Sequence, residues 1–253
     1  MAARIEVLFT PAEFSGLCAR DLSRTTCVVF DVLRATTSLV TALGAGAAGV
    51  VAVGGIAEAL GWRKRRPEVL LAGERKGVRI GAALTGGVDF DLGNSPREFT
   101  PAAVAGKLIV MTTTNGTRAM RACADAAGLL AGSFLNLTAT VKFVAREKPE
   151  RLCLVCAGTG EAAALEDTLA AGAFCEALWL LKFESEPDDS ALIARGAFLD
   201  AGENLADAIR QSSNARRLLR LPEFRDDVEF CLGQDLLGLV AVRDAEGILR
   251  RKC

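Results

Sequence analysis

The segment Val28-Val-Phe-Asp31-Val-Leu-Arg34 is the first candidate for chemistry, because an acid ends an apolar run and an arginine follows three residues later. A carboxylate can bind a metal ion or accept a proton, and a guanidinium can bind an oxyanion through two hydrogen bonds. Together they indicate a site for an anionic ligand. The alternative is an internal ion pair between Asp31 and Arg34, since structural ion pairs use the same residue types.

A second candidate is the run Thr112-Thr113-Thr114-Asn115-Gly116-Thr117. Small side chains and a glycine let an anion approach the backbone N–H groups at the start of the helix expected next, where the helix dipole favours negative charge. One such residue is enough to cap a helix, so a cap at Thr114 or Asn115 is the alternative. Because five small polar residues are present, we expect this corner to bind an anion.

A third candidate is Cys156-Ala-Gly158-Thr-Gly160-Glu161, which is followed by Glu166 and Asp167. Both acids could bind a metal ion. Adjacent residues of a helix point about 100° apart, so both serve one ion only if the helix start is irregular. Asp167 falls on the apolar stripe of the expected helix and is the better candidate for the inward-facing acid.

Two further motifs have structural explanations. In Asp91-Leu-Gly-Asn94-Ser95-Pro96-Arg-Glu98, a capping box accounts for the residues from Ser95 onward but leaves Asp91 and Asn94 unexplained. The glycines of 44–49 match the letters of a dinucleotide-binding motif but follow a helix and open a strand, the reverse of the required order. A nicotinamide oxidoreductase would rest on that motif alone.

The composition excludes several kinds of catalysis. The chain of 253 residues has 30 Lys and Arg against 31 Asp and Glu, and it contains neither histidine nor tyrosine. Histidine-based acid–base chemistry, His-ligated zinc and Ser–His–Asp triads are therefore excluded. The net charge of −1 argues against a nucleic-acid partner, and Arg216–Arg217 reads as a solvated helix end.

The eight cysteines and the chain start predict the compartment. The start Met1-Ala-Ala-Arg lacks the apolar stretch of a signal peptide, so we expect a cytoplasmic protein with free, mostly buried thiols. Cys153 and Cys156 lie three apart in a strand-like run and should point to opposite faces. Residues 35–57 carry no charge, yet their glycines favour a buried helix, turn and strand over a membrane span.

The elements that must position these residues alternate along the first two thirds of the chain. We expect strands at 5–9, 27–31, 50–53, 69–72, 108–112, 152–156 and 238–243. We expect helices at 37–43, 56–65, 117–127, 136–147, 165–182, 189–201, 205–212 and 215–219. This pattern predicts one α/β domain spanning 1–253, with a mostly parallel, mixed sheet between two helical layers and a helical C-terminal third. The polar candidates then lie at carboxyl ends of strands, where such sheets bind ligands.

Six of these segments, in this order, resemble the 2-phosphosulfolactate phosphatase family: FDVLRATTS (30–38), GERKG (73–77), FDLGNSP (90–96), TTTNGT (112–117), CAGTG (156–160) and LEDTLAAG (165–172). The resemblance implies an α/β/α cytoplasmic enzyme of the coenzyme M pathway. It would use Mg²⁺ to hydrolyse the phosphate ester of 2-phospho-3-sulfolactate or a related phosphorylated 2-hydroxy acid. The chain departs from the family pattern at Glu161–Ala164 and at Ala241.

The resemblance also implies roles for individual residues. Asp31 is expected to be a metal ligand or a base, with Glu74 and Asp167 or Glu166 nearby as metal ligands. Arg34 and Arg75 are expected to act in catalysis by binding oxyanions. The substrate-binding set adds Asn94, Ser95, Thr113, Thr114, Asn115, Gly116 and Thr117.

A metal ion is expected because helix ends are too weak for the chemistry alone. A helix N-terminus contributes about 0.3–1 kcal/mol to anion binding, whereas catalysis typically lowers the barrier by about 8 kcal/mol or more. The expected partners are one small anionic substrate and neither nucleic acid nor membrane, and the oligomeric state is left open, with a homodimer as one option. A non-catalytic anion- or nucleotide-binding module on the same architecture is the alternative function.

Overall fold

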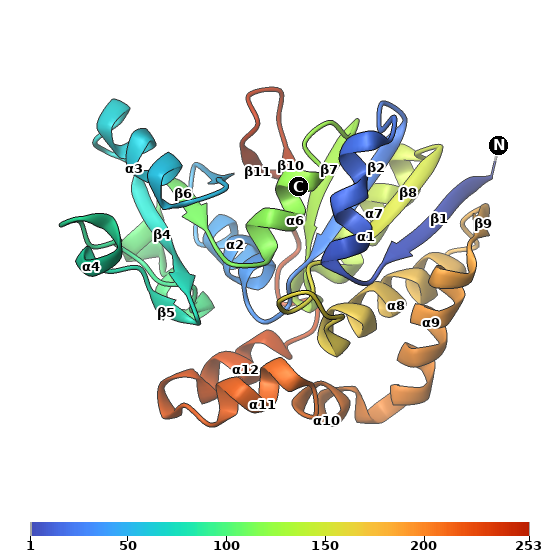
Figure 1. Ribbon diagram of the computed structural model, residues 1–253. Helices are drawn as coiled ribbons and strands as arrows, with labels where there is room; N and C mark the ends of the chain where they lie inside the picture. Colours follow the sequence, from blue (N-terminus) through green and yellow to red (C-terminus); the bar gives the residue numbers. More distant parts are fainter. Residues whose placement is uncertain (1, 253) are drawn as a thin grey trace.

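A computed structural model describes residues 2–252 (Figure 1). Eleven strands form one mixed sheet in the order β5-β4-β6-β3-β11-β10-β7-β2-β8-β1-β9. The strands are β1 (Ala3–Leu8), β2 (Thr25–Phe30), β3 (Gly49–Ala52), β4 (Leu70–Arg75), β5 (Val78–Arg79), β6 (Leu108–Thr112), β7 (Gly128–Gly132), β8 (Arg151–Cys156), β9 (Ser185–Pro187), β10 (Val240–Arg243) and β11 (Leu249–Lys252).

The sheet contains two parallel groups of strands. In one group β4, β6 and β3 pair in parallel. In the other, β7, β2, β8, β1 and β9 do so. The antiparallel hairpin of β10 and β11 lies between the groups. The predicted mixed, mostly parallel sheet is confirmed.

Helices cover both faces of the sheet, as the α/β/α prediction requires. They are α1 (Pro11–Ser15), α2 (Ala35–Gly44), α3 (Ile56–Arg65), α4 (Ala82–Thr85), α5 (Pro101–Val104), α6 (Gly116–Ala122), α7 (Leu137–Glu147), α8 (Leu165–Leu180), α9 (Asp189–Ala201), α10 (Leu205–Arg210), α11 (Ser213–Leu219) and α12 (Arg225–Cys231). The C-terminal third is largely helical, and Figure 1 shows α10–α12 as a row across the lower part of the view, below α2 and β5.

Alternate residues of the central strands enter two different cores. Cys27 and Val29 of β2 pack with α1, α2 and α6, whereas Val28 and Phe30 pack with α7, α8 and α9. Strand β8 follows the same alternation, so Cys153 belongs to the first core and Cys156 to the second. The prediction that these two thiols point to opposite faces is therefore confirmed.

The uncharged stretch 35–57 forms α2, a turn, β3 and the start of α3. Within residues 2–252, no helix combines the length and apolar character that a bilayer crossing requires.

Candidate active site

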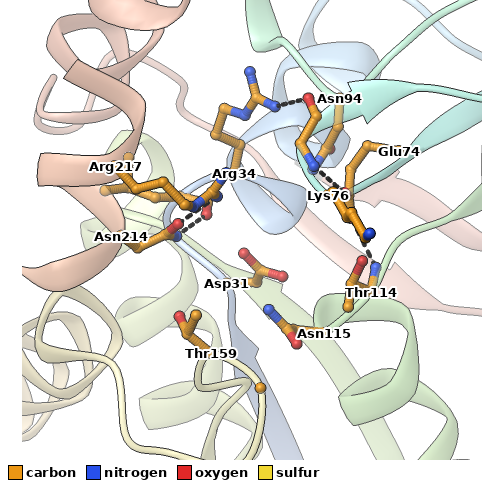
Figure 2. A pocket seen from close by; sticks show the side chains of 13 residues that line it. Asp31, Arg34, Glu74, Lys76, Asn94, Thr114, Asn115, Thr159, Asn214 and Arg217 are labelled. Carbon is orange, nitrogen blue, oxygen red and sulfur yellow. Dashed lines mark hydrogen bonds between the residues drawn. The ribbon is translucent and has the colours of Figure 1, made fainter. Parts of the chain in front are cut away.

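One cavity of about 290 Å³ collects residues from six parts of the chain. Figure 2 shows Asp31 near its centre, between side chains of α11 on one side and of the turn after β4 on the other. The cavity is lined by Asp31, Leu33, Arg34, Glu74, Lys76, Gly77, Asn94, Thr114, Asn115, Thr159, Gly160, Asn214 and Arg217. The strand ends singled out from the sequence therefore do converge.

Asp31 follows β2 directly and is fixed by the start of α2. Its Oδ1 accepts a hydrogen bond of 3.2 Å from the N–H of Ala35, and its own N–H donates to Thr36. A Cβ at position 116 would lie 2.6 Å from Asp31 Oδ2, so Gly116 allows α6 to approach this carboxylate closely. Position 116 thus requires a glycine because a larger side chain would collide with Asp31, which a sequence pattern alone does not reveal.

The Asp31 carboxyl is almost fully buried, with 7% of its surface exposed, and forms no ion pair within residues 2–252. The pKa of this carboxyl is raised to about 7, mainly by burial and also by the nearby carboxylates of Glu74 and Glu166, while hydrogen bonds from backbone N–H groups oppose the rise. The alternative of an Asp31–Arg34 ion pair is wrong, because Arg34 pairs elsewhere.

Arg34 is held by partners on three sides. Its Nη1 donates to Asp227 Oδ2 of α12 at 2.5 Å, and its Nη2 donates to the carbonyl of Gly77 at 2.9 Å. The guanidinium also stacks on the Phe224 ring, 4.2 Å from the centroid. Asp227 receives a second bond of 2.6 Å from the Ser95 hydroxyl. Ser95 therefore contacts Arg34's partner rather than the cavity.

Glu166 and Asp167 begin α8 and are both buried. Asp167 Oδ1 accepts from the N–H of Val32 at 2.9 Å, and its Oδ2 accepts from the N–H of Gly158 at 3.1 Å. Burial, followed by repulsion from Glu166 and Asp31, raises the pKa of Asp167 well above its ordinary value. Asp167 thus faces inward, as its place on the apolar stripe indicated, and joins the loops after β2 and β8.

Glu166 differs from Asp167 in its hydrogen bonding. Its Oε1 accepts from Asn214 Nδ2 at 3.2 Å, while its buried Oε2 has no hydrogen-bond partner. Burial raises its pKa, although bonds from Ser212 and Asn214 and the nearby Arg217 oppose the shift. A buried carboxylate oxygen without a partner is costly, and a cation would satisfy it.

The threonine corner is largely bonded to itself. The N–H of Thr113 donates to Thr117 Oγ1 at 3.1 Å, and the N–H of Thr117 donates to Thr113 Oγ1 at 3.2 Å. These two hydroxyls hold the turn together. Thr114 and Asn115, by contrast, line the cavity, so the part of the corner that can meet an anion is narrower than the five residues predicted.

A family model described as 2-phosphosulpholactate phosphatase matches residues 14–246. The chain belongs to this family. A probable 2-phosphosulfolactate phosphatase of Thermotoga petrophila is 43% identical over 85% of this chain and 87% of its own length. Relatives of the same description in Caldanaerobacter subterraneus and Nostoc punctiforme are 36% and 31% identical, over 92% and 95% of this chain and 93% and 94% of their own lengths. The family is one of phosphoric monoester hydrolases, as the resemblance predicted.

Two residues predicted from the phosphatase motifs, Glu74 and Arg75, form hydrogen bonds within the protein. Glu74 Oε2 accepts from the N–H of Gly77 at 2.7 Å, and its Oε1 accepts from the N–H of Thr114 at 2.8 Å. Arg75 Nη2 donates to Thr112 Oγ1 at 3.0 Å and does not line the cavity. Glu74 thus joins two cavity loops, and the roles of Glu74 in metal binding and Arg75 in catalysis stay predictions.

Other functional candidates of this phosphatase family member were missed from the sequence. Asp227 has no exposed side-chain surface and holds Arg34 from α12, a helix that the sequence analysis did not predict. Lys76 lies in the family motif GERKG (73–77) and Thr159 in CAGTG (156–160), and membership of these motifs could have identified both residues. Arg217 was interpreted as part of a solvated helix end; it is exposed in the last turn of α11, as that interpretation requires, but it also lines the cavity, which the sequence did not indicate.

The departure from the family pattern at Glu161 has a local explanation. Its carboxylate accepts from Arg118 Nη1 of α6 at 2.7 Å, on the surface beside the cavity. The pair links α6 to the loop after β8, which contributes Thr159 and Gly160 to the lining.

Proposed function

We propose that this protein is a Mg²⁺-dependent phosphatase that hydrolyses the phosphate ester of 2-phospho-3-sulfolactate, releasing sulfolactate and phosphate. The observation that carries the proposal is the buried Asp31 carboxylate, which lies in the cavity without a basic partner and beside further buried acids. Membership of the phosphatase family and the names of the relatives support the substrate.

The side chains around Asp31 fit a hard divalent cation. Histidine is absent from the chain, and the available donors are oxygens, which Mg²⁺ prefers. Glu166 Oε2 is a buried carboxylate oxygen without a partner. Within residues 2–252 no group of three or more acids or cysteines is placed to hold a metal alone, which agrees with the habit of Mg²⁺ of binding through one or two carboxylates and retaining waters.

Asp31 and Glu166 are the residues that would hold the ion, and Asp167 would fix the loops around them. Bound there, Mg²⁺ supplies charge neutralisation for the phosphoryl oxygens. Asp31 would act as a ligand, or as a base that accepts the proton of the attacking water; its raised pKa suits the second role. Thr114 and Asn115, which line the same cavity, would orient the phosphate.

The test is phosphate release from 2-phosphosulfolactate, 2-phospholactate and p-nitrophenyl phosphate, each with Mg²⁺ and with EDTA. We expect EDTA-sensitive release that is fastest from 2-phosphosulfolactate. Release from 2-phospholactate alone would support the proposed phosphatase activity but contradict the proposed substrate. A folded protein that hydrolyses none of the three would contradict the proposal and favour the binding module.

A further inference from the structure

The basic residues that line the cavity differ in whether an acid within the protein already neutralises their charge. Arg34 is already paired with buried Asp227. Lys76, in the turn after β4, and Arg217, on α11, also line the cavity, but neither forms an ion pair within the described chain. We call these two residues the basic rim. Figure 2 places them on opposite sides of Asp31.

The backbone of the turn after β4 holds Lys76 in place. Lys76 has a φ of +56°, a left-handed conformation uncommon for lysine, and the next residue, Gly77, has a φ of +84°. The N–H of Gly77 donates to Glu74 and its carbonyl accepts from Arg34, so this turn is fixed at both ends. Glu74 and Arg34, which were expected to bind the metal ion and an oxyanion, therefore also position Lys76.

Arg217 reaches the same turn from the other side. Its Nη2 donates to Asn214 Oδ1 at 2.6 Å, and a Cβ at position 77 would lie 2.9 Å from its Nη1. Gly77 therefore provides the space that the guanidinium occupies. The two residues of the basic rim come from segments about 140 residues apart in sequence; Lys76 belongs to this turn, and Arg217 packs beside its Gly77.

An unsatisfied group in the same cavity indicates a ligand independently. Asn94 is 6% exposed, and its Oδ1 has no hydrogen-bond partner. Its amide group lines the cavity and can present either an oxygen or an NH₂ group. Buried polar atoms of this kind are normally satisfied by a ligand, an ion or water.

We infer that the basic rim binds a second anionic group of the substrate, a sulfonate or carboxylate, while the phosphate lies beside Asp31. This inference rests on the proposed function and deepens it: the substrate class is a small phosphate ester that carries at least one further strongly acidic group. The hydroxyls of Thr113 and Thr117 bond within their own turn, so the basic rim is the better site for the second anion. Lys76 and Arg217 thereby determine specificity.

The test compares Lys76→Met and Arg217→Met with matched controls. Arg216→Met removes the neighbouring charge on α11, where Arg216 bonds the carbonyl of Gln211, and Lys107→Met removes an exposed lysine before β6. For each protein kcat/KM is measured for 2-phosphosulfolactate and for p-nitrophenyl phosphate, which has no second anion. The dissociation constant of 3-sulfolactate is measured by calorimetry in Mg²⁺.

For each rim variant we expect kcat/KM for 2-phosphosulfolactate to fall about 10- to 100-fold, mainly through KM, with a smaller fall for p-nitrophenyl phosphate. Binding of 3-sulfolactate should weaken by a similar factor, while the two controls stay within about twofold of the parent protein. Equal losses on both phosphate esters, or no loss, would overturn the inference.

The two proposals fail separately. If the parent protein hydrolyses none of the phosphate esters, the proposed function fails, and the calorimetry then decides the inference. If it hydrolyses 2-phosphosulfolactate while the rim variants keep the ratio of the two kcat/KM values, only the inference fails.

Discussion

The two sides of the cavity are built differently. On the acidic side Asp31 lines the cavity, while Glu166 and Asp167 are buried outside its lining. Asp31 and Asp167 are oriented by backbone N–H groups. On the basic side Lys76 and Arg217 are exposed, and neither forms an ion pair with another of residues 2–252. Buried groups of like charge are costly to the fold and must be fixed by many contacts. Exposed cations cost little, and under the two proposals above the acidic side would carry the reaction while the basic side would select the ligand.

The largest expected effect comes from Asp31→Asn. Loss of the carboxylate should lower kcat by about 10²- to 10³-fold or more, because the isosteric amide carries no negative charge to bind a cation strongly and cannot act as a base. Exposed Asp125→Asn is the control. Thermal shift with and without Mg²⁺ separates the two roles: a ligand role predicts that Mg²⁺ no longer stabilises the variant, whereas a base role leaves that stabilisation intact. Full retained turnover would remove Asp31 from the mechanism.

The next effect concerns the buried ion pair of Arg34 and Asp227, which distinguishes Arg34 from the two residues of the basic rim. Asp227→Asn leaves the Arg34 guanidinium buried without its partner and should reduce the free energy of unfolding by about 3–5 kcal/mol, as for other broken buried pairs. Asp226→Asn, at the adjacent exposed residue, should change it by less than about 1 kcal/mol. Urea unfolding of the two variants checks this difference, and equal losses would contradict it.

A smaller effect is the pH dependence that the acidic side imposes. The pKa of Asp31 rises from 3.8 to about 7 on folding, so the folded state binds this proton more tightly than the unfolded state. The resulting stability is present below about pH 4 and is lost as the pH rises toward 7, by at most roughly 4 kcal/mol. In EDTA the parent protein should therefore lose more unfolding free energy between pH 5 and pH 7.5 than Asp31→Asn. Parallel pH profiles would show that Asp31 does not titrate in this range.

The smallest effect is expected at the surface pair of Glu161 and Arg118. Both side chains are substantially exposed, at 70% and 44%, so solvent screens their attraction. Glu161→Gln should change the free energy of unfolding by less than about 1 kcal/mol. A larger loss in urea unfolding would show that the loop after β8 depends on this pair.

Much of the fold could be predicted because its strands are short apolar runs with β-branched residues. The strand at 108–112 and the helices at 56–65 and 189–201 have the predicted bounds. Strand β7 was missed: its sequence, Gly-Leu-Leu-Ala-Gly, has no β-branched residue, and the preceding helix α6 ends at Ala122 rather than 127. Its pairing with β2 and with β10 identifies β7 as a strand.

The candidate site was predictable where a residue stands at the end of its own strand, and not where its partner comes from far along the chain. Asp31 and Thr114 follow strands whose ends meet. Asp227 lies in a short, highly charged helix whose sequence reads as solvent-exposed, and its burial depends on Arg34 and Ser95, both more than 130 residues away. Long-range pairing of this kind leaves no local pattern in the sequence.

The bond between Arg34 and Asp227 has a consequence for the protein during its synthesis. The cavity lining extends from Asp31 to Arg217, and the group that holds Arg34 is added ten residues later. A chain still growing on the ribosome can form strand β2 early, but it has to be nearly complete before the pocket can assemble. Premature termination anywhere before residue 227 therefore yields fragments in which Arg34 lacks its carboxylate partner.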